Sequence, residues 1–204
     1  QRLAAAGGDG AAEIWQSDGT LVSTFRRPGR AETVASVHWS PDGRMLAAGL
    51  GHVVSLWRAH GSLGSELQGH TQEVRCVRWS RDGRKLASTS ADHTIRVWRP
   101  DGTSLRVLRG HQAGVGRAAW SPDGRHLASI SEDATLWVWN VDAGRPEWIA
   151  LHLPGEAGPP VTFSPTGEIL HGDPQAIEKE LVYLVERADK SIDLLAPAKF
   201  RKRF

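Results

Sequence analysis

The chain has 204 residues, a formal net charge of +2 at neutral pH and one cysteine. Because the lysines and arginines are spread along the sequence rather than gathered in a block, we expect no nucleic-acid partner. The lone Cys76 excludes an intrachain disulfide and favours a reducing, cytoplasmic compartment. No stretch approaches the roughly 18 consecutive apolar residues that cross a bilayer, so we expect no membrane partner.

Two series of aromatic residues recur along the chain with the same spacing. One series precedes a turn of the Ser-Pro-Asp-Gly type and comprises Trp39, Trp79, Trp120 and Phe163. The other comprises Trp15, Trp57, Trp98 and Trp139. Both series advance by about 41 residues, which indicates an internal structural repeat. Trp137 and Trp148 belong to neither series, so they are candidates for surface contacts.

Each repeat contains four short segments in which apolar and polar residues alternate. In the unit 69–110 these segments are Val74–Trp79, Lys85–Thr89, Thr94–Trp98 and Ser104–Leu108. Alternation with a period of two predicts β-strands, and the proline and glycine of the turn predict a hairpin between the first two. We therefore predict four-stranded antiparallel sheets that bury their faces against one another.

The repeats divide residues 1–195 into five units. Their approximate bounds are 1–27, 28–68, 69–109, 110–153 and 154–195. The first unit begins just after a missing turn glycine and lacks one strand, so we expect this chain to be the C-terminal portion of a longer protein. In the last unit, residues 174–180 predict a short helical insert between strands. The basic tail, residues 196–204, predicts a short helix opened by Pro197.

These repeats resemble the WD40 family. The resemblance rests on Gly-His pairs at 69–70 and 110–111, Leu-Ala-Ser at 86–88 and 127–129, Asp92 and Asp133, and the strand ends TIRVW and TLWVW. It implies an all-β fold, a β-propeller of four-stranded antiparallel blades, of which this chain supplies an incomplete arc of about 4.75 blades. The divergent ending is similar to the C-terminal portion of large bacterial multi-domain WD40 proteins.

In WD40 proteins a histidine, a serine or threonine, an aspartate and a tryptophan of one repeat form a buried hydrogen-bonded tetrad. Transferred by position, the resemblance implies two complete tetrads: His70, Ser88, Asp92 and Trp98, and His111, Ser129, Asp133 and Trp139. The repeat ending at Trp57 departs from the pattern and has Arg30, Ala47 and Gly51 instead. The repeat ending at Trp15 keeps Asp9 but has Ala5. We expect lower local stability in these two repeats.

Ser88, His70 and Asp92 also have the residue types of a hydrolase triad. Because the same set recurs one period later and ends on a tryptophan each time, we interpret it as structural. The nine histidines show no metal-ligand spacing, and no glycine-rich phosphate-binding loop occurs. We therefore expect no catalysis, metal or cofactor in this segment, with any catalytic domain upstream of residue 1.

Propellers that resemble this chain contact their partners through residues at the rim of the central opening. By position, these residues are Thr33, Leu50, Glu73, Arg75, Ala91 and Glu132. We predict a non-catalytic scaffold or sensor module of a larger signalling protein, which binds a protein or peptide at this rim. Two alternatives stay open: a propeller-hosted enzyme with a rim active site, and a structural element that self-associates through the open blade edge.

Overall fold

The computed structural model describes residues 2–7, 10–26, 32–151, 161–164, 166, 169–171, 183–186 and 192–195. All regular elements among these residues are β-strands, so the all-β prediction is confirmed for them. Within the same residues, no helix is long and apolar enough to cross a membrane. The helices predicted at 174–180 and 196–204 lie outside the described residues. The chain forms two compact units, Gln1–Pro146 and Glu147–Phe204, which we describe separately.

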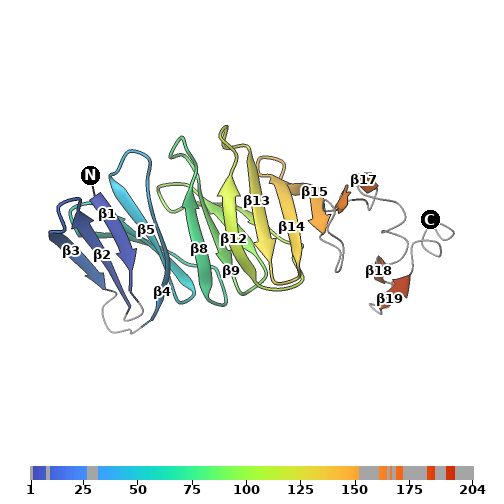
Figure 1. Cartoon of the computed structure of the whole chain (residues 1–204), viewed down its shortest axis with the longest axis horizontal. Coiled ribbons are helices and arrows are strands. Elements are labelled where there is room, and N and C mark those ends of the chain that lie inside the picture. Colours follow the sequence, from blue (N-terminus) through green and yellow to red (C-terminus); the bar gives the residue numbers. More distant parts are fainter. Residues whose placement is uncertain are drawn as a thin grey trace. The chain divides into compact units, whose positions relative to one another are not determined.

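The first unit is built from antiparallel sheets whose strands pair in chain order (Figure 1). The first sheet contains β1 (Arg2–Ala6), β2 (Ala11–Gln16) and β3 (Leu21–Arg26). The second contains β4 (Val34–Trp39), β5 (Met45–Leu50), β6 (Val53–Arg58) and β7 (Leu63–Leu67). The third contains β8 (Val74–Trp79), β9 (Leu86–Ser90), β10 (Ile95–Trp98) and β11 (Ser104–Leu108). The fourth contributes β12 (Val115–Trp120), β13 (His126–Ser131) and β14 (Thr135–Asn140). The predicted four-stranded sheets are thus confirmed for the second and third repeats.

One strand register recurs in all four sheets. The tryptophan of the second aromatic series pairs with a leucine on the preceding strand. These pairs are Leu3 with Trp15, Leu46 with Trp57, Leu86 with Trp98, and Leu127 with Trp139. Because a slip of one residue would move every side chain to the opposite face, the shared register places equivalent residues of each repeat on equivalent faces. It also identifies β1 as the counterpart of β5, β9 and β13.

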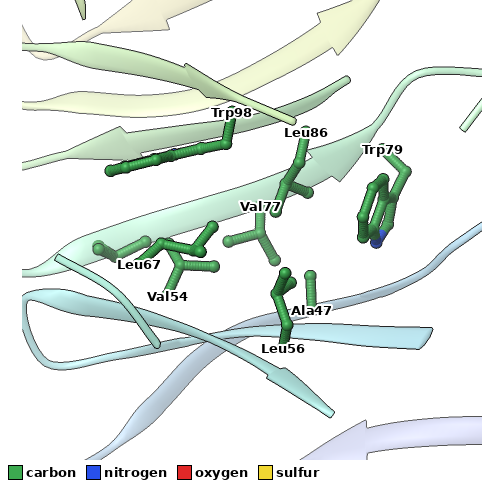
Figure 2. Packing of buried hydrophobic residues seen from close by; sticks show 9 residues of the cluster. Ala47, Val54, Leu56, Leu67, Val77, Trp79, Leu86 and Trp98 are labelled. Atoms are coloured by element: carbon green, nitrogen blue, oxygen red, sulfur yellow. The ribbon is translucent and has the colours of Figure 1, made fainter. Parts of the chain in front are cut away.

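The hydrophobic core lies between successive sheets. Between the second and third sheets, Leu56 and Val54 pack against Val77, Leu86 and Trp98 (Figure 2). Equivalent clusters fill the space between the first and second sheets and between the third and fourth. Each large side chain buried in this way contributes about 1.5–3 kcal/mol relative to leaving it in water. The faces of each sheet are therefore stabilised mainly by the neighbouring repeat.

The recurring Ser-Pro-Asp-Gly turn joins the first two strands of a repeat. In the second repeat, the Ser40 hydroxyl donates to Asp42 at 2.6 Å and accepts the Met45 N–H at 2.9 Å. Gly43 has φ of +67° and donates its N–H to the Ser40 carbonyl at 2.8 Å. The same bonds recur around Ser80 and Ser121. The turn recurs because every repeat needs this hairpin, and the predicted role of the motif is confirmed.

In the second unit, the described strands pair antiparallel with their chain neighbours. β15 (Arg145–Leu151) pairs with β16 (Val161–Phe163), which pairs with β17 (Ile169–His171). β18 (Tyr183–Glu186) pairs with β19 (Ile192–Leu195). The two strands predicted within 181–186 and 191–195 are therefore confirmed at Tyr183–Glu186 and Ile192–Leu195, and the turn predicted at 187–190 lies outside the described residues.

Candidate functional site

A chain of hydrogen bonds joins His70, Ser88, Asp92 and Trp98 across the third repeat. The Trp98 indole N–H donates to the Ser88 hydroxyl at 2.8 Å, and this hydroxyl lies 2.8 Å from His70 Nε2. His70 Nδ1 lies 2.9 Å from the Asp92 carboxylate. These bonds connect the loop before β8 to β9, to the β9–β10 turn and to the end of β10. The fourth repeat has the same bonds among His111, Ser129, Asp133 and Trp139, at 2.8 to 2.9 Å.

The protonation of the third-repeat tetrad follows from its burial and hydrogen bonds. Burial lowers the pKa of His70, although Asp92 opposes this shift. Burial raises the pKa of Asp92, but hydrogen bonds from Thr94, the Thr71 N–H and His70 outweigh it and hold the pKa at about 2. A neutral His70 therefore donates from Nδ1 to an ionised Asp92 and accepts the Ser88 hydroxyl proton at Nε2. The pKa values of His111 and Asp133 are lowered in the same way.

Both tetrads are built to fix loops rather than to attack a substrate. Ser88 is 0% exposed and Ser129 is 1% exposed, so neither hydroxyl can reach a ligand. Each hydroxyl also already accepts a tryptophan N–H and donates to a histidine. Among the described residues, no group of three His, Cys, Asp or Glu side chains is placed to hold a metal ion.

A further layer of side chains covers each tetrad, and the sequence analysis missed it. The Arg96 guanidinium lies 5.8 Å from the centre of the Trp98 ring, and Trp137 stacks on Trp139 at 5.0 Å. A Cβ at Gly69 would lie 2.5 Å from Arg96 Nη1, so the glycine of the Gly-His pair leaves the space that the guanidinium occupies. Trp137 is therefore a packing residue that covers the tetrad. Its position opposite Ser129 on β14 is the signal that identifies this role.

The second repeat forms its β5–β6 turn, the counterpart of the β9–β10 turn, without a tetrad. Ala47 occupies the serine position and is 0% exposed. The ladder continues to a Leu50–Val53 pair, and the two-residue turn between them relies on Gly51 at φ of +52°. The Glu32 carboxylate fills the space beside Gly51, where a Cβ would lie 2.8 to 3.0 Å from its atoms. Arg30 and Asp9 of the predicted set lie outside the described residues.

The predicted rim residues lie at the same end of the sheets as the tetrad loops. Arg75, near the start of β8, forms an ion pair at 2.6 Å with Glu132 in the β13–β14 turn. Gly114 permits this pair, because a Cβ there would lie 2.7 Å from Arg75 Nη1. Backbone bonds from Ala91 N to Glu73 O, at 2.9 Å, and from Glu132 N to Gly114 O, at 3.0 Å, fix the neighbouring loops.

The predicted rim residues differ in exposure, and Leu50 is the one that is buried. Thr33, Glu73 and Glu132 are exposed, and Arg75 and Ala91 are half-buried. Leu50 is 2% exposed and packs in the core between the first two sheets, so its side chain cannot contact a partner as placed. The tight Gly51 turn causes this difference, because it keeps Leu50 within the strand ladder. We define the rim surface as Thr33, Glu73, Arg75, Ala91 and Glu132.

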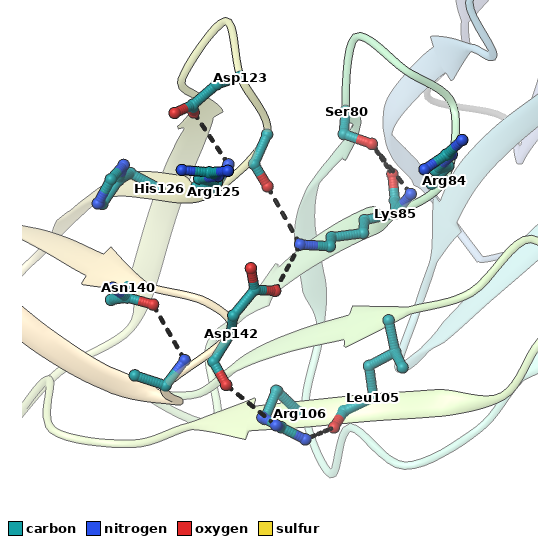
Figure 3. Close-up of polar contacts among 12 residues, drawn as sticks. Ser80, Arg84, Lys85, Leu105, Arg106, Asp123, Arg125, His126, Asn140 and Asp142 are labelled. Atoms are coloured by element: carbon teal, nitrogen blue, oxygen red, sulfur yellow. Dashed lines mark hydrogen bonds and ion pairs between the residues drawn. The ribbon is translucent and has the colours of Figure 1, made fainter.

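A second polar region lies at the opposite end of the sheets, around a cavity of about 720 Å³ between the third and fourth repeats. Lys85 Nζ lies 2.7 Å from the Asp142 carboxylate and donates to the Gly124 carbonyl at 3.2 Å (Figure 3). Arg106 donates to the Asp142 carbonyl at 3.1 Å. These contacts join the two repeats, so two of the cations beside this cavity are engaged within the chain.

Comparison with known families agrees with this architecture. The family model described as WD domain, G-beta repeat matches residues 19–58, 61–99 and 102–140, which together make up more than half of the chain. Each match begins with the last strand of one sheet and continues through the first three strands of the next, so the three matches contain β3–β6, β7–β10 and β11–β14. No curated protein shows significant similarity to the chain.

Proposed function

The chain belongs to the WD40 repeat family, and from this premise we propose that it is a non-catalytic module that binds a protein or peptide within a larger signalling protein. WD40 repeats generally mediate protein–protein interactions, which supports a protein ligand in general. We further propose that the partner contacts the rim surface.

The observation that carries this proposal is the charge arrangement of the rim surface. Arg75 and Glu132 bridge two repeats and neutralise each other, with 60% of the Glu132 side chain still exposed. Glu73 is exposed beside them and makes no side-chain hydrogen bond or ion pair with the described residues. The rim surface therefore has an excess negative charge, which favours a partner segment that carries lysine or arginine.

A selection from a random peptide library displayed on phage tests this proposal on the full chain. We expect the selected peptides to be rich in lysine or arginine. Glu73→Lys should weaken their binding by tenfold or more, because it replaces attraction with repulsion. Asp82→Lys, at the opposite end of the sheets, is the matched control and should leave binding within twofold. Equal binding by the Glu73→Lys variant would show that the partner lies elsewhere.

Exposed apolar residues of the first sheet support self-association as a second candidate. Leu3 on β1 is 61% exposed, and Leu21 and Val22 on β3 are 45% and 37% exposed. Exposed apolar residues on edge strands favour pairing with another chain. Light scattering over a hundredfold range of concentration should then show growth in size, which Leu3→Lys suppresses. A size that does not change with concentration excludes this candidate.

A further inference from the structure

A smaller pocket, of about 310 Å³, lies where β4, β8 and β12 end. His38, Arg78 and Trp120 contribute to it from these strands, and Arg81 contributes from the turn after β8. No aspartate or glutamate lines it. Arg75, in contrast, lies near the start of β8, so this pocket and the rim surface are at opposite ends of one strand.

Arg81 departs from the repeat in a way that the turn does not require. The equivalent position is Pro41 in the second repeat and Pro122 in the fourth. The turn around Arg81 nevertheless keeps the hydrogen bond from Ser80 to Asp82, at 2.6 Å, and the backbone bond from Gly83 to Ser80, at 2.9 Å. The Arg81 side chain is exposed and makes no hydrogen bond or ion pair with the described residues. Its charge is therefore available to a ligand.

The other polar groups of the pocket are held in place by the backbone. Arg78 Nη1 donates to the Val77 carbonyl at 2.8 Å, and the Trp120 indole N–H donates to the Arg78 carbonyl at 2.9 Å. The Trp79 N–H donates to His38 Nδ1 at 3.2 Å, so a neutral His38 carries its proton on Nε2 and can donate from there. Burial lowers the pKa of His38, and the neighbouring Arg78 lowers it further.

The space in the pocket comes from a small residue. Ala119 is the counterpart of Arg78 in the next repeat, and it lines the pocket with a single methyl group. A volume near 300 Å³ is at the lower limit for ligand pockets and suits one short side chain or a chain terminus. Two arginines in a lining that has no acidic residue favour a carboxylate, which accepts paired hydrogen bonds from a guanidinium.

We propose that this pocket binds the carboxylate group of an acidic peptide segment, which Arg78 and Arg81 clamp and His38 orients. The site goes beyond the peptide contact proposed for the rim surface, because it lies at the other end of β8 and selects the opposite charge. Two of the four cations beside the larger cavity, Lys85 and Arg106, are bound to Asp142, and two aspartates line that cavity. The smaller pocket has no acidic residue in its lining, and Arg81 has no hydrogen-bond or ion-pair partner among the described residues.

The test follows the indole N–H signal of Trp120 by NMR while the full chain is titrated with an acetylated, amidated pentapeptide that contains one glutamate. We expect saturable binding in the millimolar range, which the same peptide with glutamine fails to show. A glutamate-free pentapeptide with a free C-terminal carboxylate forms a second arm. If it binds more tightly than the first peptide, the carboxylate comes from a chain terminus; if less tightly, it comes from a side chain.

Two variants and a control separate this site from general charge attraction. Arg81→Pro restores the turn residue of the other repeats, so it should fold normally and weaken binding at least fivefold. Ala119→Leu should abolish binding by filling the pocket without changing charge. Arg84→Ala removes an exposed arginine from the same turn outside the pocket, and Glu73→Lys alters the rim surface; both should bind within twofold of the parent chain. The proposal is wrong if Arg81→Pro binds normally, if Arg84→Ala loses as much, or if inorganic phosphate displaces the peptide more readily than acetate does.

Discussion

The second and third repeats have the same strand register, but different interactions hold the turn between their second and third strands. In the third repeat, a buried polar tetrad ties the loop before β8 to the β9–β10 turn. In the second repeat, β5 and β6 are almost entirely buried, and the ladder simply continues to the two-residue turn at Gly51. Apolar packing between sheets is therefore sufficient to form the blade, and the tetrad adds a specific connection between two loops.

This difference shows that the residues of the repeat motif have two separate roles, which are to set the strand register and to hold a loop. The tryptophan and leucine of each repeat set the register, because Leu46 and Trp57 pair without a tetrad in the same way as Leu86 and Trp98 do with one. The histidine, serine and aspartate hold the loop that leads to Glu73 and Arg75. The polar network therefore acts mainly on the geometry of the rim surface, where we place the proposed partner.

The largest effect that distinguishes the two repeats is expected from Asp92→Ala. The Asp92 carboxylate accepts bonds from Thr71 N and Thr94 N, both at 3.0 Å, and pairs with His70. Its loss leaves buried donors of His70 and Thr94 without an acceptor and should lower the free energy of unfolding by about 3 kcal/mol or more. Urea denaturation measures this change. Asp82→Ala is the control in an exposed turn and should cost about 1 kcal/mol or less; an equal cost would show that the tetrad adds nothing special.

Exchanging the central residue between the two repeats gives the next largest effect. Ser88→Ala removes the acceptor of the Trp98 N–H and the donor to His70, and should destabilise the chain by about 2 kcal/mol. The reverse change, Ala47→Ser, places a hydroxyl in an apolar site that is 0% exposed, and should cost about 1–2 kcal/mol. Urea titration of both variants checks the pair. A stabilising Ala47→Ser would contradict our view that the second repeat is complete without a polar network.

Much of this architecture was predictable, because strand alternation and turn chemistry are local properties of the sequence. The strands Val74–Trp79 and Ser104–Leu108 were predicted with their observed bounds, and the tetrad members followed from a family pattern. The ion pair between Arg75 and Glu132 was not predictable, since it joins different repeats and depends on the missing side chain of Gly114. Such contacts arise from the packing of neighbouring sheets, which alternation within one repeat does not encode.

The predicted rim residues Leu50 and Ala91 show a second limit of prediction from the sequence. Both precede the turn between the second and third strands of their repeats. Ala91 follows the strand β9 and is half-buried, whereas Leu50 still pairs with Val53 and faces the core. Transfer by position assumes the same turn conformation in every repeat, and the replacement of the turn aspartate by Gly51 changes that conformation.

Hydrogen exchange at neutral pH compares the two repeats without mutation. We expect the amides of residues 45–57 to open with a free energy about 1–2 kcal/mol lower than those of 86–98, because no side-chain network ties their loops. Mass spectrometry of peptides from the two segments measures this difference. Equal or stronger protection over 45–57 would mean that the apolar packing of β5 and β6 fully compensates for the absent tetrad.

The smallest expected effect is a dependence of that difference on pH. Burial depresses the pKa of His70 and His111 below the ordinary value of 6.5 in the folded state, and Arg96 lowers that of His70 further. As the pH falls, these histidines bind protons in the unfolded chain before they do so in the folded chain. The stabilisation of the fold by the neutral histidines is therefore complete above about pH 6.5 and declines as the pH falls below that value. After correction for intrinsic exchange rates, protection of 86–98 should fall more between pH 7.5 and 5.5 than protection of 45–57, and the two repeats should become more alike.

His38 on β4 also has a lowered pKa, so the same experiment on His38→Gln is the control. If the decline disappears in that variant, the acid sensitivity comes from β4 and not from the tetrads.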